Sequence, residues 1–278
     1  MELLEIITES FRTLTINKLR TGLATLGIII GIGSVIALIS LGEAGQQAVQ
    51  SQIESLGSNL ITVMPGSQSS AGVRTALGST TTLTYDDAKA IAGNKELTAV
   101  KLVSPELSRR AQVTTGNNNT NTQVMGVTNA YQQVRNIVMD SGNFISDNDN
   151  LALSKTAVVG PQVITDLGLD SGLGQTIRIN KIAFRIAGVT QSKGGSGFQN
   201  QDDMIFIPLL TAQKQVFGVD YLSNISIQAV SSDAMTDAQN QVGYFLLARH
   251  KLSDPSKADF SILSQADILG AASQITGT

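Results

Sequence analysis

Few residues in this sequence could support acid–base chemistry. Asp202 and Asp203 form a carboxylate pair, and His250 is the only histidine. Adjacent residues on an extended segment point to opposite faces, so the two carboxylates are poorly placed to act together, and a solvated strand entry explains them better. His250 lies between Arg249 and Lys251 near a predicted helix end, where a solvated position favourable to the helix dipole is expected. No serine forms a recognisable motif with this histidine, so the sequence predicts no enzyme.

Metal and nucleotide sites are equally poorly supported. The chain has no cysteine and one histidine, which excludes Cys-based zinc sites and His-pair sites. Asp147-Asn148-Asp149 begins like a calcium loop but lacks the later glycine and glutamate. Gly194–Gly197 is glycine-rich, yet no lysine and helix start follow as a phosphate loop requires. We therefore expect no cofactor and no metal on this chain.

The composition limits the class of partner. The 278 residues suffice for one large domain or two smaller ones, and the formal net charge is −3. Because no basic excess is present, nucleic acid is not an expected partner. Charged residues make up 15% of the chain, below the roughly 25% that is usual for soluble domains.

A stretch of twenty residues without a charge, Gly22–Leu41, is the strongest local signal. A helix of this length spans about 30 Å, which is the hydrocarbon thickness of a bilayer. The alternatives are a buried core helix and a cleaved signal peptide. The run is too long for the apolar part of a signal peptide and follows an N-terminal region with three glutamates. We predict a transmembrane helix over residues 21–42.

The flanking charges predict the orientation of this helix. Arg12, Lys18 and Arg20 precede it, whereas the next basic residue after it is Arg74. The positive-inside rule then places the N-terminus in the cytoplasm and residues 43–278 outside the cell membrane. Residues 1–20 carry apolar residues at near-helical spacing, which favours an amphipathic helix on the inner membrane surface. A cytoplasmic continuation of the membrane helix is the alternative.

Small residues recur along one side of the predicted span. Gly27 and Gly31 form a G-x-x-x-G pair that Ser34 extends. Such spacing lets helix backbones approach closely, but glycine is common in membrane helices in general. These three residues are a candidate contact between membrane helices.

The outer region alternates between short strands and helices without a strict βα repeat, which predicts an α+β (mixed α/β) fold. Residues 43–57 are expected to continue the membrane helix. A capping box at Thr84–Asp87 should begin a helix, and Ser67–Thr82 should form a mobile loop. Strands are expected at the following segments: 59–64, 99–103, 110–114, 122–127, 157–160, 176–180, 183–189, 204–207, 225–228 and 260–263. Further helices are expected at 161–168, 208–217 and 234–249, and from Ser264 to the C-terminus.

Several motifs, read in order along the chain, resemble MacB-type ABC transporter permeases. Residues 17–36 resemble the first span of that family, and residues 174–189 resemble its paired G-K-x-I-x-I and F-x-V-I-G-V motifs. The most specific match joins Asp202-Asp203 to Phe206-Ile207-Pro208. Residues 275–278 resemble the lead-in to a second span. The resemblance makes Gly188, Asp202, Asp203 and Pro208 family-motif residues with a structural role.

The resemblance implies an extracytoplasmic core domain, here residues 43–278, with two subdomains. Residues 43–105 and 204–278 would form a βαβ-type part, and residues 106–203 an inserted, mostly β part. It further implies a homodimeric, multi-pass permease in the inner or plasma membrane, with an FtsX-like membrane domain of three more spans beyond residue 278. A separate cytoplasmic ATPase subunit would carry ATP and magnesium, and a membrane-fusion adaptor is often present outside.

Two functions from different classes follow. The first is the N-terminal part of an exporter permease that couples ATP hydrolysis on a partner to the outer domain. The second is a single-span, membrane-anchored sensor or binding module without transport. Further spans and a neighbouring ATPase gene would favour the first.

Overall fold

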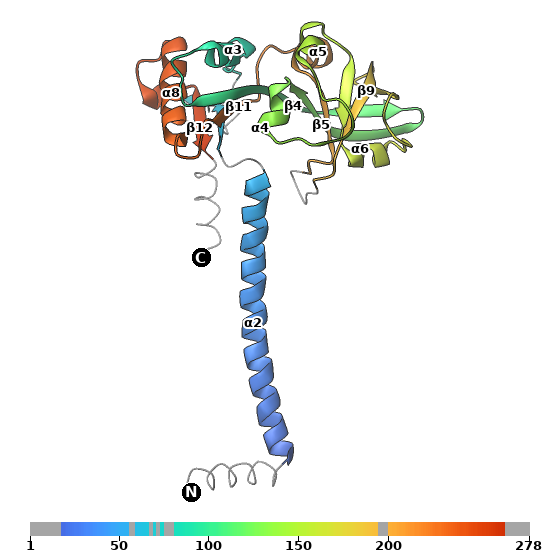
Figure 1. Ribbon diagram of the computed structural model, residues 1–278, viewed down its shortest axis with the longest axis vertical. Helices are drawn as coiled ribbons and strands as arrows, with labels where there is room; N and C mark the ends of the chain where they lie inside the picture. The colour runs from blue at the N-terminus through green and yellow to red at the C-terminus, as the bar shows by residue number, and fades with distance from the viewer. Residues whose placement is uncertain are drawn as a thin grey trace. The chain divides into compact units, whose positions relative to one another are not determined.

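The computed structural model describes residues 18–55, 59–66, 69–70, 73–74, 81–193 and 200–264. The chain divides into two compact units, Met1–Glu54 and Ser55–Thr278, which we describe separately. Figure 1 shows the elements of both. The expected amphipathic helix at 1–20 and the helix after Ser264 lie almost wholly outside the described residues.

In its described residues, the first unit is one helix, α2 (Lys18–Ser55), of 38 residues. Its stretch Lys18–Glu43 contains an 18-residue window with a mean hydropathy of 2.4 and is long and apolar enough to cross a membrane. The helix continues beyond this stretch without a break, which confirms the predicted continuation as far as Ser55. Leucine and isoleucine side chains on all sides of the apolar stretch are exposed within the chain, as in Ile28, Ile29 and Ile30. An all-round apolar surface is typical of a helix that lies in lipid or packs against other helices.

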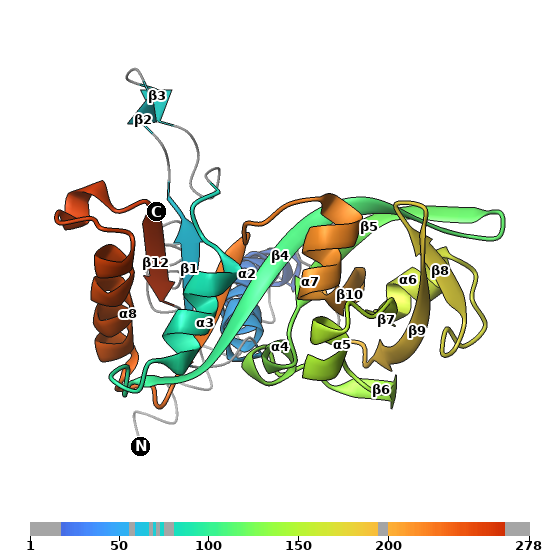
Figure 2. The ribbon, with the colours of Figure 1, turned by 90° about the horizontal axis from the view of Figure 1, so that it is seen from above.

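One half of the second unit contains two interlocked βαβ units. The first is β1 (Leu60–Pro65), α3 (Tyr85–Gly93) and β4 (Val100–Thr115); the second is β11 (Asn224–Ala229), α8 (Met235–Arg249) and β12 (Phe260–Ser264). The strand order is β12-β1-β11-β4, and all neighbours are antiparallel. Each parallel pair is therefore separated by a strand of the other unit, as in ferredoxin-like folds. Figure 2 shows α3 and α8 beside this half of the sheet.

The other half is a closed ring of six strands. The C-terminal part of β4 joins β5 (Asn118–Val127), β7 (Thr156–Val159), β8 (Thr176–Ile179), β9 (Ile182–Thr190) and β10 (Met204–Pro208). The pairings run β4-β5-β10-β7-β9-β8 and return to β4. We call this half the barrel. Side chains such as Val113, Ile179 and Phe184 are fully buried in its interior, which is a packed core. Closure leaves these strands with few free edges.

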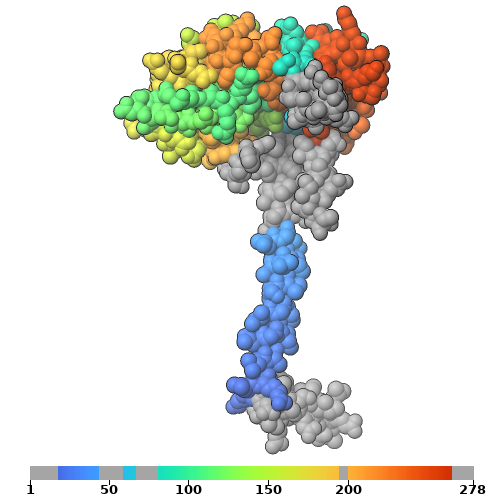
Figure 3. All heavy atoms as spheres, turned by 180° about the vertical axis from the view of Figure 1, so that it is seen from behind, coloured from blue at the N-terminus to red at the C-terminus, as the bar shows by residue number. Residues whose placement is uncertain are grey.

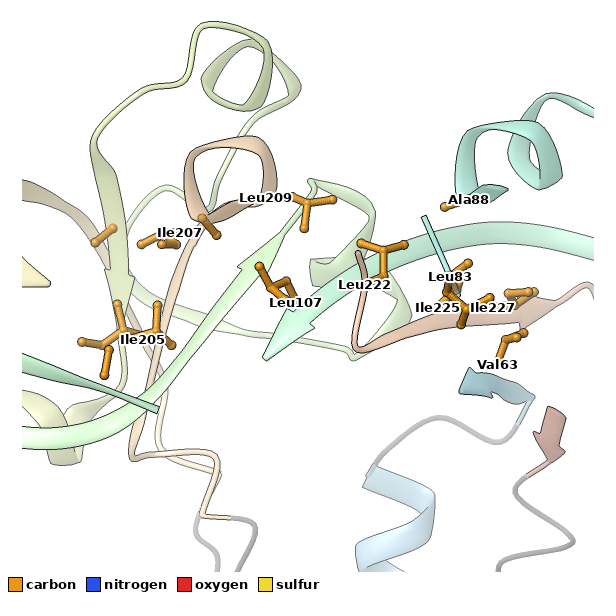
Figure 4. Packing of buried hydrophobic residues seen from close by; sticks show 14 of the residues in the cluster. Val63, Leu83, Ala88, Leu107, Ile205, Ile207, Leu209, Leu222, Ile225 and Ile227 are labelled. Carbon is orange, nitrogen blue, oxygen red and sulfur yellow. The ribbon is translucent and has the colours of Figure 1, made fainter. Parts of the chain in front are cut away.

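A single apolar cluster runs through both halves. Figure 4 shows it passing from Val63, Ile225 and Ile227 through Leu222 and Leu107 to Ile205 and Ile207. A second, smaller cluster on the outside of the barrel packs Met125, Tyr131 and Phe206 under the segment that follows β5. Burial of this apolar surface is the main stabilising contribution to the body.

Short helices and turns connect the strands. They are α4 (Ala130–Val134), α5 (Asp147–Leu151), α6 (Pro161–Asp166), α7 (Leu209–Thr211), the π-helical η1 (Ala212–Phe217) and the 3-10 turn η2 (Pro255–Lys257). The expected proline start and glycine end of the helix at 161–168 are confirmed, because Pro161 occupies the first turn and Gly168 has φ +62°. The Thr84–Asp87 capping box is also confirmed.

The structure corrects two expectations about the strands. The segments predicted separately at 99–103 and 110–114 form one strand, β4. Pro105 lies between the two predicted segments. The carbonyl of Glu106 accepts a hydrogen bond from the N–H of Ser223, so the imide nitrogen of Pro105 points away from β11 and costs the ladder nothing. The expected loop at 67–82 contains, in its described part, the paired segments β2 (Ser69–Ser70) and β3 (Val73–Arg74).

Some elements had no sequence signal that we recognised. These are α4, α5 and β6 (Met139–Gly142), which pairs with β9. β10, which begins just after the expected subdomain boundary at residue 203, lies in the barrel between β5 and β7. The turn between β8 and β9 has φ +46° at Asn180 and +72° at Lys181, and a type I′ turn requires positive φ at both positions.

Candidate functional surfaces

The small residues of α2 expose the helix backbone. A Cβ added at Gly27 or Gly31 would meet nothing within 4 Å. The hydroxyl of Ser34 donates to the Gly31 carbonyl at 2.9 Å, so this polar group is satisfied within its own helix. The side of α2 that carries these three residues is therefore smooth and open, as an approaching helix would require.

Gly188 lies where β9 passes between β6 and β7. Its Cα pairs with Gly142 of β6 and with Val158 of β7. A Cβ at Gly188 would lie 2.6 Å from the carbonyl oxygen of Asn143 and 2.5 Å from the methyl carbon of Met139. The absence of a side chain is what allows β6 to approach β9 so closely.

Asp202 joins the two ends of the stretch 194–199. Its carboxylate accepts hydrogen bonds from the hydroxyl of Ser192 at 2.6 Å and from the backbone N–H of Lys193 at 2.9 Å. Its own N–H donates to the side chain of Asn200, and its carbonyl accepts from the N–H of Gln162 in α6. The residue thus fixes the base of this stretch to the barrel. The Gly194–Gly197 motif itself lies outside the described residues.

Asp203 uses a different partner from Asp202. Its carboxylate accepts a hydrogen bond from the hydroxyl of Thr122 in β5 at 2.5 Å. Pro208 ends β10 opposite Val127 and is the residue from which α7 begins. The carboxylates of Asp202 and Asp203 are both half-buried and hydrogen-bonded, each to a different partner. They therefore make two separate structural contacts, where a solvated strand entry was expected.

A buried charged pair lies where β4 passes from one half of the body to the other. Glu106 is the last residue of β4 that pairs with β11, and Leu107 is the first that pairs with β5. The carboxylate of Glu106, 2% exposed, lies 3.4 Å from the guanidinium of Arg135 in the turn after α4. The Asn224 amide donates to the same carboxylate at 2.7 Å, and Arg135 donates to the hydroxyl of Ser226 at 2.8 Å.

This pair connects to the base of the 194–199 stretch. The ammonium of Lys193 donates to the carbonyl of Arg135 at 3.0 Å, and burial lowers the pKa of Lys193. Burial works to lower the pKa of Arg135, but the charges of Glu106 and Tyr131 and the hydrogen bond to Glu106 together outweigh burial, and the pKa is raised. A continuous set of polar contacts thus runs from β11 through Glu106 and Arg135 to Lys193. We call these residues, with Asn224 and Ser226, the junction network.

His250 lies between two carboxylates. Its Nδ1 is 2.8 Å from Asp259 and its Nε2 is 3.5 Å from Asp87, and the side chain is 11% exposed. The predicted position at a helix end is confirmed, since His250 caps α8. The expectation that it is solvated is wrong, because α3 and the approach to β12 pack around the end of α8. Both ring nitrogens face carboxylates, so neither is left for a substrate.

Asp87 is the centre of this second cluster. Burial works to raise its pKa, but hydrogen bonds from Thr84 and Arg249 outweigh burial and hold the pKa below its usual value. The Nε of Arg249 lies 2.6 Å from the carboxylate. A carboxyl whose pKa is depressed by folding stabilises the protein above the unfolded pKa, and this contribution is lost as pH falls through the folded pKa.

We expect Asp87→Asn to lower the free energy of unfolding by about 2 kcal/mol at pH 7, because it removes a charged acceptor of three donors. The loss should shrink as pH falls below about 4, where the carboxyl group of the unfolded chain becomes protonated, and should vanish as pH falls through the lower pKa of the folded protein. Urea unfolding measures this loss of stability, with the near-ultraviolet signal of the tyrosines as the probe. The matched control is Asp86→Asn, whose carboxylate is 73% exposed in a surface pair with Lys89. Equal losses for the two variants would contradict the role of the cluster.

Within the described residues, no group of three or more histidine, aspartate or glutamate side chains is placed to hold a metal ion. Asp147 and Asp149 belong to α5, where Ser146 and Asp149 form a capping box. The Asp-Asn-Asp run therefore marks a helix start. The sharpest features of the described part of the body are glycine crossings and buried polar clusters that fix strands to one another.

The chain belongs to the MacB-like periplasmic core domain family, whose profile matches residues 21–243. Among solved structures, it is similar to the periplasmic region of MacB from Actinobacillus actinomycetemcomitans (TM-score 0.64, 19% identity, 80% of this chain and 95% of that one). It is also similar to the extracellular domain of the noncanonic ABC-type transporter YknZ from Gram-positive bacteria (TM-score 0.60, 17% identity, 74% and 100%). At these identities the similarity shows the fold, and it confirms the predicted α+β architecture.

Curated relatives are similar over the whole chain. The macrolide export ATP-binding/permease protein MacB of Bdellovibrio bacteriovorus is 36% identical over 100% of this chain and 43% of its own length. The protein of the same name from Chlorobium phaeobacteroides is 32% identical over 97% of this chain and 41% of its own length. The chain thus spans about two fifths of the length of these relatives. Membership of the family that the motifs indicated is confirmed.

Proposed function

We propose that this chain is the first span and extracytoplasmic domain of the permease of an ABC-type exporter. The observation that carries the proposal is the family match over residues 21–243, which runs from the apolar part of α2 into the body without interruption. Relatives named as ATP-binding/permease proteins support the transport role. A helix of 38 residues that rises about 57 Å is also long enough to cross the bilayer and extend beyond it.

In this role the chain works by binding and by transmitting motion. The energy would come from ATP hydrolysis on a cytoplasmic ATPase subunit, which would hold the nucleotide and magnesium. The outer body would handle the substrate or an adaptor protein. A homodimeric, multi-pass permease in the inner membrane would place two such bodies side by side. The small-residue side of α2 suits contact with another membrane helix, and the continuity of α2 suits the transmission of movement.

The encoding locus tests the proposal directly. Three further apolar spans after codon 278, with a neighbouring gene for an ATPase that carries a phosphate-binding loop, are the expected result. A stop codon at position 279 with no such gene nearby would overturn it. The chain would then be a single-span, membrane-anchored sensor or binding module.

The absence of cysteine allows a clean test of orientation. We expect a cysteine placed at Gly93, in the exposed last turn of α3, to react with a membrane-impermeant maleimide in intact cells. A cysteine placed at Lys18 should react only after lysis, because the positive-inside rule puts this end in the cytoplasm. The opposite labelling pattern would contradict the proposed topology.

We expect Gly31→Arg, near the middle of the apolar stretch, to reduce the membrane-inserted fraction sharply. A charged residue at the centre of a membrane helix costs about 3 kcal/mol in insertion, whereas one near the membrane surface costs little. Gly42→Arg at the end of the stretch is therefore the control. Extraction of membranes at high pH separates the inserted from the peripheral chain. An unchanged inserted fraction for Gly31→Arg would argue that α2 does not span the bilayer.

A further inference from the structure

The outside of the barrel carries an arginine-rich face. Antiparallel neighbours that lie opposite each other point to the same side of a sheet, and so do residues two apart on a strand. Thr114 of β4 is opposite Arg178 of β8, and Thr176 of β8 is opposite Arg185 of β9. Arg110, four residues before Thr114, shares this side. We call Arg110, Arg178 and Arg185, all exposed, the arginine face.

The three guanidinium groups have no carboxylate partner. Among the described residues, none of them takes part in an ion pair. Arg110 donates only to the backbone carbonyl of Asn121. The barrel strands β4 from Leu107, β5, β8 and β9 contain no aspartate or glutamate at all. Asp149, near the start of β7, is engaged by the capping box of α5.

The positions of the arginines favour an external anion. Arg178 and Arg185 are diagonal neighbours on adjacent strands, with Cα atoms roughly 7 Å apart. Like charges at this spacing repel each other, so a carboxylate between them would be bound by both. Each guanidinium can also hold a carboxylate through two parallel hydrogen bonds. The positive charge of the arginine face contrasts with the chain as a whole, which carries a formal net charge of −3.

We propose that the arginine face docks an extended, carboxylate-rich segment of a partner protein. Arg110 lies about 13 Å along β4 from the position opposite Arg178, which is too far for one phosphate or lipid headgroup to bridge. A peptide chain can cover this distance with successive carboxylates. The exposed residues between the arginines are amides and hydroxyls that can bind peptide groups, namely Gln112, Asn119, Asn121 and Thr176.

The surroundings of the face argue against a lipid surface as the partner. Apart from Ala183, the exposed residues on this side of β4, β5, β8 and β9 are polar or charged, so little apolar surface is available to enter a bilayer. In Figure 3 the β4–β5 hairpin, drawn in green, stands at the surface at one end of the body, where a partner could reach it. This binding function does not depend on the transport role, because a receptor or a permease could use it equally.

A fluorescein-labelled decaglutamate peptide is the probe, with the whole chain in a neutral detergent at low salt and fluorescence anisotropy as the readout. We expect the triple variant R110Q/R178Q/R185Q to weaken binding by roughly 10-fold or more, as the loss of three charge pairs implies. The control removes the same number of charges from exposed lysines elsewhere, K95Q/K101Q/K257Q. It should change binding less than about 3-fold. Both triple variants change surface residues, and thermal unfolding should confirm that each stays folded.

Three results would overturn the proposal. The first is no measurable binding of the peptide to the unsubstituted chain. The second is equal weakening by the two triple variants, which would mean non-specific attraction. The third comes from competition with glycerol phosphate, which carries the headgroup chemistry of an anionic lipid. If glycerol phosphate displaces the labelled peptide at a concentration no higher than unlabelled decaglutamate needs, the face is a phosphate site. None of these results bears on the transport role, which the locus and the labelling experiment test separately.

Discussion

Gly188→Val should destabilise the body by about 3 kcal/mol or more, because a valine forced into a filled site displaces backbone as well as side chains. The methyl group of Met139 could move aside. The Asn143 carbonyl oxygen, 2.6 Å from the added Cβ, could move only together with β6. That strand is held in place, since the N–H of Asn143 donates to the carbonyl of Ala187 at 3.1 Å.

The same crossing constrains the opposite residue. Gly142 has φ +73°, and a Cβ there would lie 2.2 Å from the carbonyl oxygen of Ala187. The two glycines face each other across the β6–β9 pair, so neither strand has room for a side chain at this point. A substitution on either side therefore separates β6 from β9, and the smaller core cluster beside β6 would lose its cover.

Thermal unfolding of the whole chain in detergent measures this effect. The chain lacks tryptophan, but it has four tyrosines, all in the body, so near-ultraviolet circular dichroism reports on the body and not on α2. For a domain of this size a loss of 3 kcal/mol lowers Tm by roughly 6–12 °C. Gly93→Val is the control, because a Cβ there meets nothing within 4 Å. A Tm for Gly188→Val within 1–2 °C of the control would show that β6 yields more easily than its contacts suggest.

Local chemistry explains which elements could be predicted from the sequence. The helix starts at Thr84 and Pro161 and the helix ends at Gly168 and Gly218 depend on residues within one turn, and the structure has each of them. The twenty-residue apolar run likewise predicts a long helix by itself. These signals do not depend on which strand lies beside which.

Long-range pairing explains what could not be predicted. The two strands predicted at 99–103 and 110–114 are one strand, β4, and only its pairing with β11 shows that the missing N–H of Pro105, between them, is not needed. Closure of the barrel depends on the pairing of β8 with β4, in which Val113 lies opposite Ile179 and Thr114 opposite Arg178, and no local pattern encodes contacts so far apart in sequence. His250 was expected in solvent for the same reason, since the carboxylates that enclose it come from α3 and from the approach to β12.

The junction network is the clearest example of a site that sequence reasoning missed. Glu106, Arg135 and Ser226 are separated by 29 and 91 residues, and none lies in a recognisable motif. A buried glutamate in the middle of a strand is a weak signal that could have been followed, because such a residue needs a partner. The network lies where β4 leaves the ferredoxin-like half and enters the barrel, and it joins β4 and β11 to the turn after α4 at this point.

Arg135→Met should therefore lower the free energy of unfolding by about 3–5 kcal/mol, the range for breaking a buried ion pair from one side. Methionine fills much of the volume of the arginine stem, but the Glu106 carboxylate, 2% exposed, would keep only the Asn224 amide as a hydrogen-bond donor. Arg178→Met is the matched control. It makes the same substitution at an exposed residue of the body without an ion pair and should cost no more than about 0.5 kcal/mol.

A double-mutant cycle separates the charge from the packing. If the loss arises from an uncompensated carboxylate, E106Q in the R135M background should restore part of the stability, because a neutral amide tolerates burial far better than a charge. If the loss arises from packing alone, the two substitutions should add. Additivity in urea unfolding would show that Arg135 acts mainly by filling space. A restored double variant would show that the loss arises from the charge of Glu106 when it is left buried without its partner.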